Sequence, residues 1–190
     1  MLEVNLARRT PALSPAPEAA SGPVSITPLP AEGRLSFRAK ALEGRGDVAG
    51  FPVGGAINTV TATADGRTAL RLGPDEWLLR CPEGDCEDHV EAIAAAMGDS
   101  PFSLVDVSHR NVAFGLEGAD APAVLNAGCP LDLSDRGFPV GTATRTLLGK
   151  AEAVIARTGP ANWRVECWRS FGEYVHALLI DAAKDFGPAS

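Results

Sequence analysis

The segment Val105-Asp-Val-Ser-His-Arg110 brings together the residue types of a nucleophilic triad. Such a triad needs a nucleophile and a base within hydrogen-bond reach, with the base oriented by a third group. On a strand, however, Asp106 and Ser108 point to one face and His109 points to the other. The sequence also lacks the Gly-x-Ser-x-Gly elbow that presents a serine nucleophile in the α/β-hydrolases. The segment therefore predicts a structural turn rather than a catalytic site.

Thiol and imidazole groups are few and scattered along the chain. No second pair of cysteines or histidines stands close enough to Cys81 and Cys86 to complete a familiar zinc pattern. Residues 1–5 lack the basic and apolar regions of a secretory signal, so we expect a cytoplasmic protein with reduced thiols. A thiol enzyme using Cys129 is an alternative, although we expect no activity to depend on this residue. The full set is Cys81, Cys86, Cys129, Cys167, His89, His109 and His176.

Nucleotide-binding patterns are missing from the sequence. No Gly-x-Gly-x-x-Gly follows an expected strand, and Leu148-Gly-Lys150 lacks the hydroxyl residue that completes a phosphate loop. The acidic pairs Asp75/Glu76 and Asp132/Asp135 fall in expected loops, where carboxylates cap turns or face solvent. We therefore assign no catalytic, cofactor-binding or metal-binding residue to this chain.

The charge and hydropathy of the chain argue against two classes of partner. The net charge is −7 over 190 residues, and an acidic surface repels the phosphate backbone of nucleic acids. No apolar run approaches the roughly 20 residues that a membrane-spanning helix needs. The longest candidate, at 175–183, is interrupted by His176 and Asp181. We therefore expect neither nucleic acid nor a membrane as a partner.

An internal repeat is the most informative feature of the sequence. Residues 71–81 (RLGPDEWLLRC) align without gaps to residues 157–167 (RTGPANWRVEC), with matching arginine, glycine, proline, tryptophan and cysteine. An amphipathic helix is expected after each copy. A catalytic residue need not occur twice, whereas a core position in a duplicated unit should. We therefore expect Trp77 and Trp163 to pack in the core, and Cys81 and Cys167 to be buried small hydrophobes.

The elements around this repeat predict an α+β fold of duplicated antiparallel hairpin-plus-helix units, with ferredoxin-like halves. Asp85 and Asp120 are expected N-caps, and Ser170 with Glu173 forms an expected capping box whose helix carries an apolar stripe from Phe171. Strands are expected at 24–29, 34–40, 56–64, 68–72, 76–81, 102–107, 111–116, 144–148, 151–157 and 162–168, and helices at 86–97, 121–127 and from 170.

The domain organisation follows from the same patterns. Residues 23–190 are expected to form one domain that contains two repeats, at about 69–97 and 155–183. Prolines break residues 1–22, which we interpret as an N-terminal arm. Its apolar residues Leu2, Val4 and Leu6 alternate as in a strand. Two interpretations stay open, a disordered leader or an arm that lies on a partner.

Five segments carry a resemblance that none of them would carry alone. They are Leu72-Gly-Pro-Asp-Glu-Trp77, Val105-Asp-Val-Ser-His-Arg110, Leu125-Asn-Ala-Gly-Cys-Pro-Leu-Asp-Leu133, Phe138-Pro-Val-Gly-Thr-Ala-Thr-Arg-Thr146 and Arg169-Ser-Phe-Gly-Glu-Tyr174. Together they resemble the gamma subunit family of heterotetrameric sarcosine oxidase. The similarity runs over about residues 68–183, whereas the N-terminal segment and residues 44–55 match less clearly.

This resemblance implies a fold, an assembly and a reaction. The family's enzyme demethylates sarcosine oxidatively to glycine, using oxygen and releasing hydrogen peroxide. The methyl group leaves as formaldehyde, or as methylene-tetrahydrofolate where the folate acceptor is present. FAD, FMN and NAD are held by the alpha and beta subunits and zinc by the delta subunit, while gamma is not known to bear catalytic residues. Its fold is similar to the folate-binding domain of aminomethyltransferase, the glycine cleavage T-protein.

The expectation is therefore a non-catalytic structural subunit that binds alpha, beta and delta partners, with tetrahydrofolate possible in the complex. The alternative is a stand-alone tetrahydrofolate-binding protein or aminomethyltransferase-like enzyme. Asp106 would be the candidate general base of such an enzyme. Arg110, Arg145 and Arg169 lie within the resembling segments. They could pair with acidic groups on a partner, cap local carbonyls or lie on the surface.

Overall fold

The computed structural model of the chain describes residues 23–40, 42 and 44–186. The expected arm at 1–22 and the expected helix stop at Gly187-Pro188 lie outside these residues. Within the described ranges, no helix combines the length and the hydrophobicity needed to cross a membrane.

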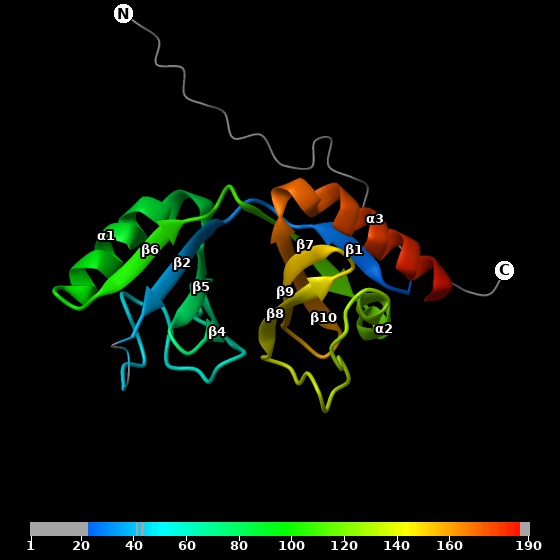
Figure 1. Cartoon of the computed structure of the whole chain (residues 1–190), viewed down its shortest axis with the longest axis horizontal. Coiled ribbons are helices and arrows are strands. Elements are labelled where there is room, and N and C mark those ends of the chain that lie inside the picture. Colours follow the sequence, from blue (N-terminus) through cyan, green and yellow to red (C-terminus); the bar gives the residue numbers. More distant parts are fainter. Residues whose placement is uncertain (1–22, 41, 43, 187–190) are drawn as a thin grey trace, which may run out of the picture.

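Two antiparallel five-stranded sheets form the framework (Figure 1). In the first sheet the order is β1 (Ser25–Pro28), β7 (Asn111–Glu117), β10 (Asn162–Trp168), β9 (Ala151–Arg157) and β8 (Ala143–Leu148). In the second it is β3 (Thr59–Ala62), β4 (Thr68–Gly73), β5 (Glu76–Cys81), β2 (Gly33–Ala39) and β6 (Phe102–Asp106). The chain starts in the first sheet, builds the whole second sheet and then returns, which confirms the expected antiparallel α+β class.

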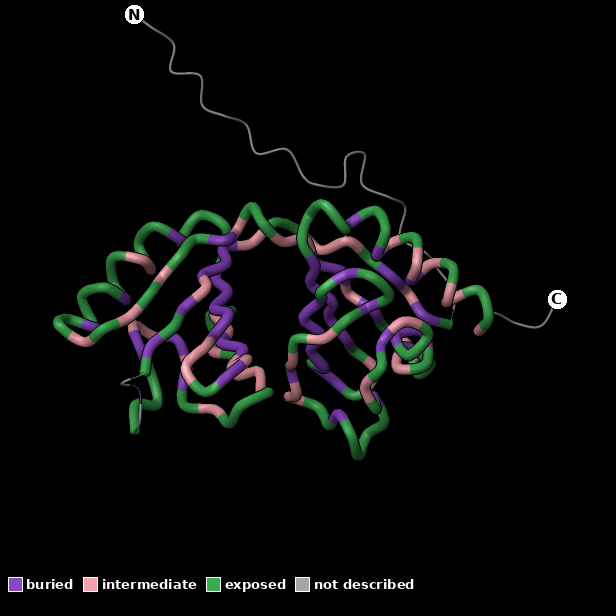
Figure 2. The backbone as a smooth tube through the Cα atoms, viewed as in Figure 1, coloured by how far each residue is buried: buried purple, intermediate pink, exposed green. Residues whose placement is uncertain are grey.

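Each sheet packs its own helices on one face. Helix α1 (Cys86–Met97) covers the second sheet, where Ile93 and Met97 join Phe37 and Trp77 in one buried cluster. Helices α2 (Ala121–Asn126) and α3 (Gly172–Ala183) cover the first sheet in a second cluster, which includes Phe114, Leu125, Ile155, Trp163, Val165, Val175 and Leu179. Buried positions gather on the strands, and the outward turns of the helices are exposed (Figure 2).

The other faces of the two sheets meet each other. Because side chains alternate along a strand, Trp77 and Leu79 of β5 face α1, while Leu78 enters a third cluster shared with Val154 and Ala156 of β9. Strands β5, β9 and β10 are therefore buried on both faces. Hydrogen bonds also join the sheets at one edge, where the Val60 amide donates to the Gly141 carbonyl at 2.8 Å.

Most predicted element boundaries are confirmed, and β9, β10 and α1 begin and end where the sequence placed them. Strand β3 is shorter than the expected 56–64 because turns close it at both ends. Before it, the Thr59 hydroxyl donates to the Ala56 carbonyl at 2.6 Å and Asn58 has φ = 65°. After it, the Gly66 amide donates to the Thr63 carbonyl at 3.1 Å.

Asp85 and Asp120 stand at the N-cap positions where the sequence placed them, but the expected side-chain capping bonds do not form. Asp85, Asp120 and Phe171 occupy the N-cap positions of α1, α2 and α3, and none makes a side-chain capping bond. Short 3₁₀ turns at Glu83–Asp85 and Arg169–Phe171 lead directly into α1 and α3. The capping box of Ser170 and Glu173 does not form because Ser170 lies inside such a turn. Phe171 is exposed, so the apolar stripe of α3 begins at Val175.

Candidate functional site

Arg71 holds the first copy of the repeated Gly-Pro turn. Its guanidinium donates to the carbonyls of Gly73 at 3.4 Å and Pro74 at 3.0 Å, and to the Gly55 carbonyl at 2.8 Å. It also lies over the Trp77 ring, 5.2 Å from the centroid. One planar side chain thus fastens the turn, a neighbouring loop and an aromatic core residue.

Arg157 repeats this arrangement in the second copy. It donates to the carbonyls of Gly159 at 3.4 Å and Pro160 at 2.7 Å, and to the Phe138 carbonyl at 3.0 Å. It lies over the Trp163 ring at 5.1 Å, and Trp163 stacks on Phe138 at 5.4 Å. The matched arginine, glycine, proline and tryptophan therefore form the same arrangement in both copies of the repeat, and the arginine makes its central contacts.

The matched tryptophans and cysteines are core residues, as predicted. Trp77 and Trp163 are each 2% exposed, and the Trp77 indole donates to the Val53 carbonyl at 3.1 Å. Burial raises the pKa of both Cys81 and Cys167 to about 12, so these thiols stay protonated at neutral pH. A protonated thiol is a poor nucleophile and a poor metal ligand.

The Asp106–Ser108 segment is a turn that follows β6, as predicted. The Ser108 hydroxyl donates to the Asp106 carboxylate at 2.5 Å, and the Ser108 amide donates to the same oxygen at 2.8 Å. The hydroxyl also accepts the Arg34 amide proton at 2.9 Å. His109 is exposed in the turn. The carboxylate thus bonds the serine directly, with no imidazole between them.

The remaining cysteines and histidines are dispersed. Cys129 is buried, with its sulfur 4.0 Å from the Thr146 hydroxyl, and the Cys86 sulfur lies 3.7 Å from the Ser108 hydroxyl. His89 contacts the Phe51 ring edge-on, while His176 stacks on Phe114 and burial lowers its pKa. Across the part of the chain that the structure describes, no three His, Cys, Asp or Glu side chains gather to hold a metal ion.

The feature that the sequence analysis missed is a buried ionic cluster between the sheets. Glu166 of β10 is 1% exposed, and its carboxylate accepts from Arg34 Nε at 3.0 Å and from Arg164 Nε at 2.8 Å. Arg80 of β5 lies 3.8 Å away. Burial opposes ionisation of Glu166, but the charges of Arg164, Arg34 and Arg80 outweigh it and lower its pKa to about 2.

Glu32 completes this cluster. Its carboxylate accepts from Arg164 through both oxygens and from Arg34 at 3.4 Å, and it lies 3.9 Å from Arg80. We call these five residues the inter-sheet cluster; it holds three arginines and two glutamates. One signal for it was present in the sequence, because Arg80 and Glu166 are equivalent positions of the repeat and carry opposite charges.

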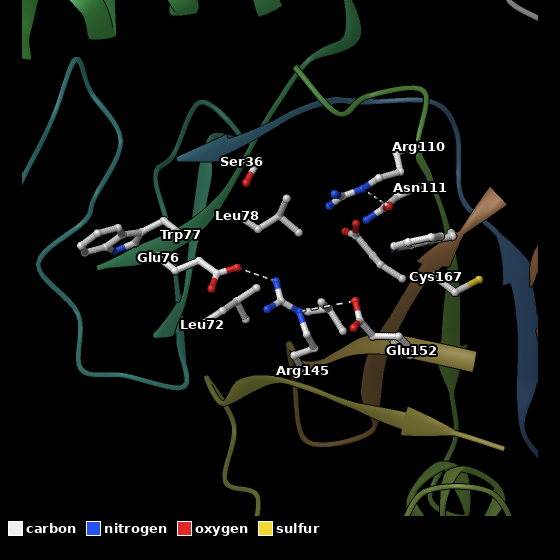
Figure 3. A pocket seen from close by; sticks show the side chains of 14 residues that line it. Ser36, Leu72, Glu76, Trp77, Leu78, Arg110, Asn111, Arg145, Glu152 and Cys167 are labelled. Carbon is white, nitrogen blue, oxygen red and sulfur yellow. Dashed lines mark hydrogen bonds and ion pairs between the residues drawn. The ribbon is translucent and has the colours of Figure 1, made fainter. Parts of the chain in front are cut away.

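A small pocket lies on the same inner surfaces (Figure 3). Arg145 of β8 crosses it to Glu76 of β5 at 2.6 Å, and its Nε lies 3.7 Å from Glu152. Glu76 is therefore the first residue of β5, as the expected strand at 76–81 has it, and it joins the sheets instead of facing solvent from a loop. The pocket encloses 20 Å³, which is room for about one water. Ligands of folate size need several hundred Å³, so this space does not fit tetrahydrofolate.

The three arginines singled out in the sequence have different environments. Arg145 is engaged within the chain by Glu76 and Glu152. Arg110 bonds Asn111 at 3.3 Å and lies over the half-exposed Trp168 ring at 5.9 Å. Arg169 is exposed, and its amide donates to the Arg110 carbonyl at 2.8 Å.

The sequence matches one protein-family model across most of its length. Residues 48–185 match the model described as "Sarcosine oxidase, gamma subunit family". The chain belongs to the sarcosine oxidase gamma subunit family. It is 36% identical over 130 residues to the sarcosine oxidase subunit gamma of Corynebacterium sp. (strain P-1), an alignment that covers 68% of this chain and 63% of that protein. The chain thus matches less than two thirds of that relative's length.

Solved structures give the same family. A chain of the heterotetrameric sarcosine oxidase from Corynebacterium sp. U-96, solved in complex with pyrrole 2-carboxylate, superposes with a TM-score of 0.80 at 30% identity. The superposition covers 97% of this chain and 99% of that one. The aminomethyltransferase T of the Bartonella henselae glycine cleavage system has a TM-score of 0.63 at 12% identity, covering 82% of this chain and 45% of that one. This second similarity shows the fold alone, and it confirms the fold relationship implied by the sequence.

In this gamma subunit family member, the resembling segment at 125–133 runs from the end of α2 into a loop. Asn126, at the end of α2, donates to the carbonyls of Cys129 at 3.1 Å and Leu131 at 2.6 Å. The Asp132 carboxylate accepts the Ser134 amide proton at 3.0 Å, and bonds from Ser134 lower its pKa. These bonds fix the loop after α2, and Asp132 is a turn residue as expected. Asp135 also lies in a turn, where it pairs with Arg157 at 2.6 Å.

Proposed function

We propose that this chain is the non-catalytic gamma subunit of a heterotetrameric sarcosine oxidase. In that role it supports oxidative demethylation of sarcosine to glycine, with hydrogen peroxide and either formaldehyde or methylene-tetrahydrofolate as products. The observation that carries the proposal is the superposition over 97% of this chain on one chain of such a complex. The 36% identity to a subunit gamma supports it independently.

The geometry of the polar groups supports a structural role. The serine of the triad-like segment is bonded to its neighbouring carboxylate, and burial keeps the Cys81 and Cys167 thiols protonated. The Glu166 carboxylate is neutralised by arginines rather than raised toward a pKa suited to general-base work at neutral pH. The groups that suggested chemistry in the sequence therefore serve the fold.

The proposed partners are the alpha, beta and delta subunits of the assembly. We propose that alpha and beta carry FAD, FMN and NAD, that delta carries zinc, and that the complex works in the cytoplasm. We further propose that residues 23–190 fold as one domain and that residues 1–22 form an arm. The net charge of −7 supports a protein partner rather than a nucleic acid.

Co-expression tests this proposal. The full chain is produced with and without candidate alpha, beta and delta chains from the same organism, and the mixtures are separated by size exclusion. We expect one complex containing all four chains, and loss or dissociation of that complex when this chain is omitted. An assembly that forms and stays equally stable without this chain would contradict the proposal.

The folate-dependent alternative is tested on the isolated full chain by calorimetry. The aminomethyltransferase-like fold favours this alternative, but the 20 Å³ pocket between the sheets disfavours it. A larger open cavity of 500 Å³ is lined in part by Arg45, Ile57 and Arg71. We expect no heat of binding with tetrahydrofolate. Saturable binding at one site per chain would favour the alternative.

A further inference from the structure

Two buried polar groups beside the inter-sheet cluster have no hydrogen-bond partner among the described residues. They are Arg80 Nε and the Thr68 hydroxyl. Arg80 is 7% exposed, and Thr68 is its register partner on the neighbouring strand β4. A buried donor without a partner costs free energy comparable to a lost hydrogen bond, so native structures rarely leave one unpaired. Two such groups stand at paired positions, where a hydrogen-bonding water or ligand would satisfy them.

The residues that carry these groups, Arg80 and Thr68, both line one open cavity. Its volume is 310 Å³, and its other walls come from Glu32, Gly66, Cys81 and Pro82. Glu32 contributes the carboxylate in this lining, and its two oxygens accept from Arg164 and Arg34. Burial keeps the Cys81 thiol protonated. The unpartnered groups beside this cavity therefore include two donors, Arg80 Nε and the Thr68 hydroxyl.

The net charge of the inter-sheet cluster also favours a negatively charged ligand. Three arginines face two glutamates, so one positive charge is left over. The surplus falls on Arg80, because its Nη1 is 3.8 Å from Glu166 and 3.9 Å from Glu32, beyond hydrogen-bond length, whereas Arg34 and Arg164 bond these carboxylates directly. Burial, together with the charge of Arg164, lowers the pKa of Arg80 to about 10. The charged Arg80 guanidinium therefore lies within ion-pair distance of two carboxylates that are hydrogen-bonded to the other two arginines.

We propose that this cavity binds one carboxylate or another small monoanion, held by Arg80 and Thr68. A guanidinium offers parallel N–H donors that match the two oxygens of a carboxylate. The Thr68 hydroxyl supplies a further donor from the adjacent strand. A single negative charge brings the cluster of three arginines and two glutamates to neutrality. The carboxylate has two sources, a free small acid or an acidic side chain of a partner subunit.

Acetate is the probe for the site itself, titrated into the isolated full chain at constant ionic strength. We expect the melting temperature to rise by about 3 °C at five times the dissociation constant. We also expect a saturable shift of one arginine Nε–H signal in nitrogen-15 NMR. Arg80→Gln should abolish both effects, because the four remaining charges balance. Arg38→Gln is the matched control, since Arg38 is an exposed arginine paired with Asp75.

A second variant keeps the test independent of the arginine. Thr68→Val has the same shape without the hydroxyl, so it should fold normally without acetate and bind acetate several-fold more weakly. An acetate effect of equal size in the wild type, Arg80→Gln and Thr68→Val would be a general salt effect and would overturn the proposal for a free acid.

The second source is tested in the co-expressed complex, and this arm rests on the proposed assembly. If an acidic side chain of a partner fills the cavity, Arg80→Gln should loosen the complex on size exclusion, while Arg38→Gln should not. Acetate should then bind the isolated chain but not the intact complex. The proposal fails if acetate shows no saturable effect on the isolated chain. That result is independent of whether the complex forms, so the two proposals can fail separately.

Discussion

Glu166 is the carboxylate on which three buried arginines converge. Bringing such a cluster out of water is costly, and a buried ion pair is weak evidence for stability by itself. Removing one partner is a different matter, because the charges left behind stay buried without compensation. At this scale the cluster is best understood as a set of mutually dependent charges that fixes how the two sheets meet.

The first prediction is that Glu166→Gln strongly destabilises the chain. It removes the buried carboxylate charge that Arg34 and Arg164 bond and leaves them only Glu32. Breaking a buried pair in this way costs about 3–5 kcal/mol. The free energy of unfolding is measured by urea denaturation of the full chain. Glu152→Gln is the control, since Glu152 is 56% exposed and lies 3.7 Å from Arg145, and exposed pairs contribute about 0–1 kcal/mol. Equal losses in the two variants would contradict a central role for Glu166.

The second prediction concerns pH. Burial and the competing arginine charges leave the pKa of Glu166 at about 2, against an ordinary value of 4.5. The unfolded chain therefore takes up a proton at a higher pH than the folded chain does, and stability from this group is full above about pH 5. It is lost as the pH falls toward 2. Urea denaturation across this range should give a shallower pH dependence for Glu166→Gln than for the wild type.

Carbon-13 NMR of the glutamate side chains checks the same prediction directly. One glutamate carboxyl group of the folded wild type should still be ionised at pH 3. The carbon signal of this group should be missing from the Glu166→Gln spectrum. If every glutamate has titrated by pH 3, the ionic environment described for Glu166 is wrong.

Sequence reasoning could locate part of this cluster and not the rest. Arg80 and Glu166 occupy matched places in a repeat, and opposite charges at matched core positions are a signal for contact between the copies. Glu32 and Arg34 lie outside the repeat, and Arg164 replaces the Leu78 of the first copy. Their convergence depends on how the sheets face each other, which no spacing within the chain reveals.

The hairpin with its arginine is the unit at the next scale. A planar guanidinium can reach three carbonyls of two segments at once, which an ammonium on a flexible stem cannot do. Arg71 and Arg157 use this geometry on equivalent turns. The Gly-Pro turn, the aromatic core residue and the arginine therefore form one unit, which explains why these residue types recur together in both copies.

The third prediction is that Arg157→Lys and Arg71→Lys both destabilise the chain, and Arg157→Lys by more. Arg157 is 5% exposed, so its replacement leaves buried carbonyls unpaired at about 1–3 kcal/mol. Arg71 is partly exposed, and water can replace some of its bonds. Thermal unfolding gives the comparison, with the exposed Arg38→Lys as the control. If Arg38→Lys proves as damaging as Arg157→Lys, the carbonyl bonds of the buried Arg157 guanidinium are not what stabilises the chain.

Helix positions were easier to predict than helix starts. The apolar spacing of Ile93 and Met97 placed α1 correctly because that spacing reports directly on a buried face. The capping residues misled because Asp85 and Ser170 belong to 3₁₀ turns that continue from the preceding chain. Such a turn supplies backbone bonds at the helix entry, so a side-chain cap is not required. Residue type alone does not distinguish a helix that begins at a side-chain cap from one that continues a 3₁₀ turn.

Two lobes that share an interior define the whole molecule. Each copy of the repeat contributes a hairpin to a different sheet, and the inner faces of those sheets enclose both an apolar layer and the inter-sheet cluster. Strands β5, β9 and β10 are buried along nearly their whole length. The sequence indicates a strand of this kind where apolar residues follow one another with few breaks. It does not indicate that β1 belongs with β7 and not with β2, because that pairing spans the entire second sheet.

The fourth prediction is that the two lobes unfold together. Trp77 reports from the second sheet and Trp163 from the first, and both are buried. With the half-exposed Trp168 changed to Phe, a further Trp163→Phe or Trp77→Phe change leaves one reporter in one lobe. In each variant, the fluorescence midpoint in urea should coincide with that variant's own circular dichroism midpoint, as expected for a two-state domain.

The reason for this coupling is the shared interior. Leu70 and Leu78 of the second sheet pack with Val154 and Ala156 of the first, and Glu166 of the first sheet is neutralised by Arg34 of the second. Opening one lobe alone would expose this apolar layer and would leave buried charges in the other lobe without their partners. A half-unfolded state therefore has a high free energy. If the fluorescence midpoint of either tryptophan falls at a lower urea concentration than the circular dichroism midpoint, the lobes are separable domains. Residues 23–190 would then be two units held by their contact, and Glu166→Gln should widen the gap between the two midpoints.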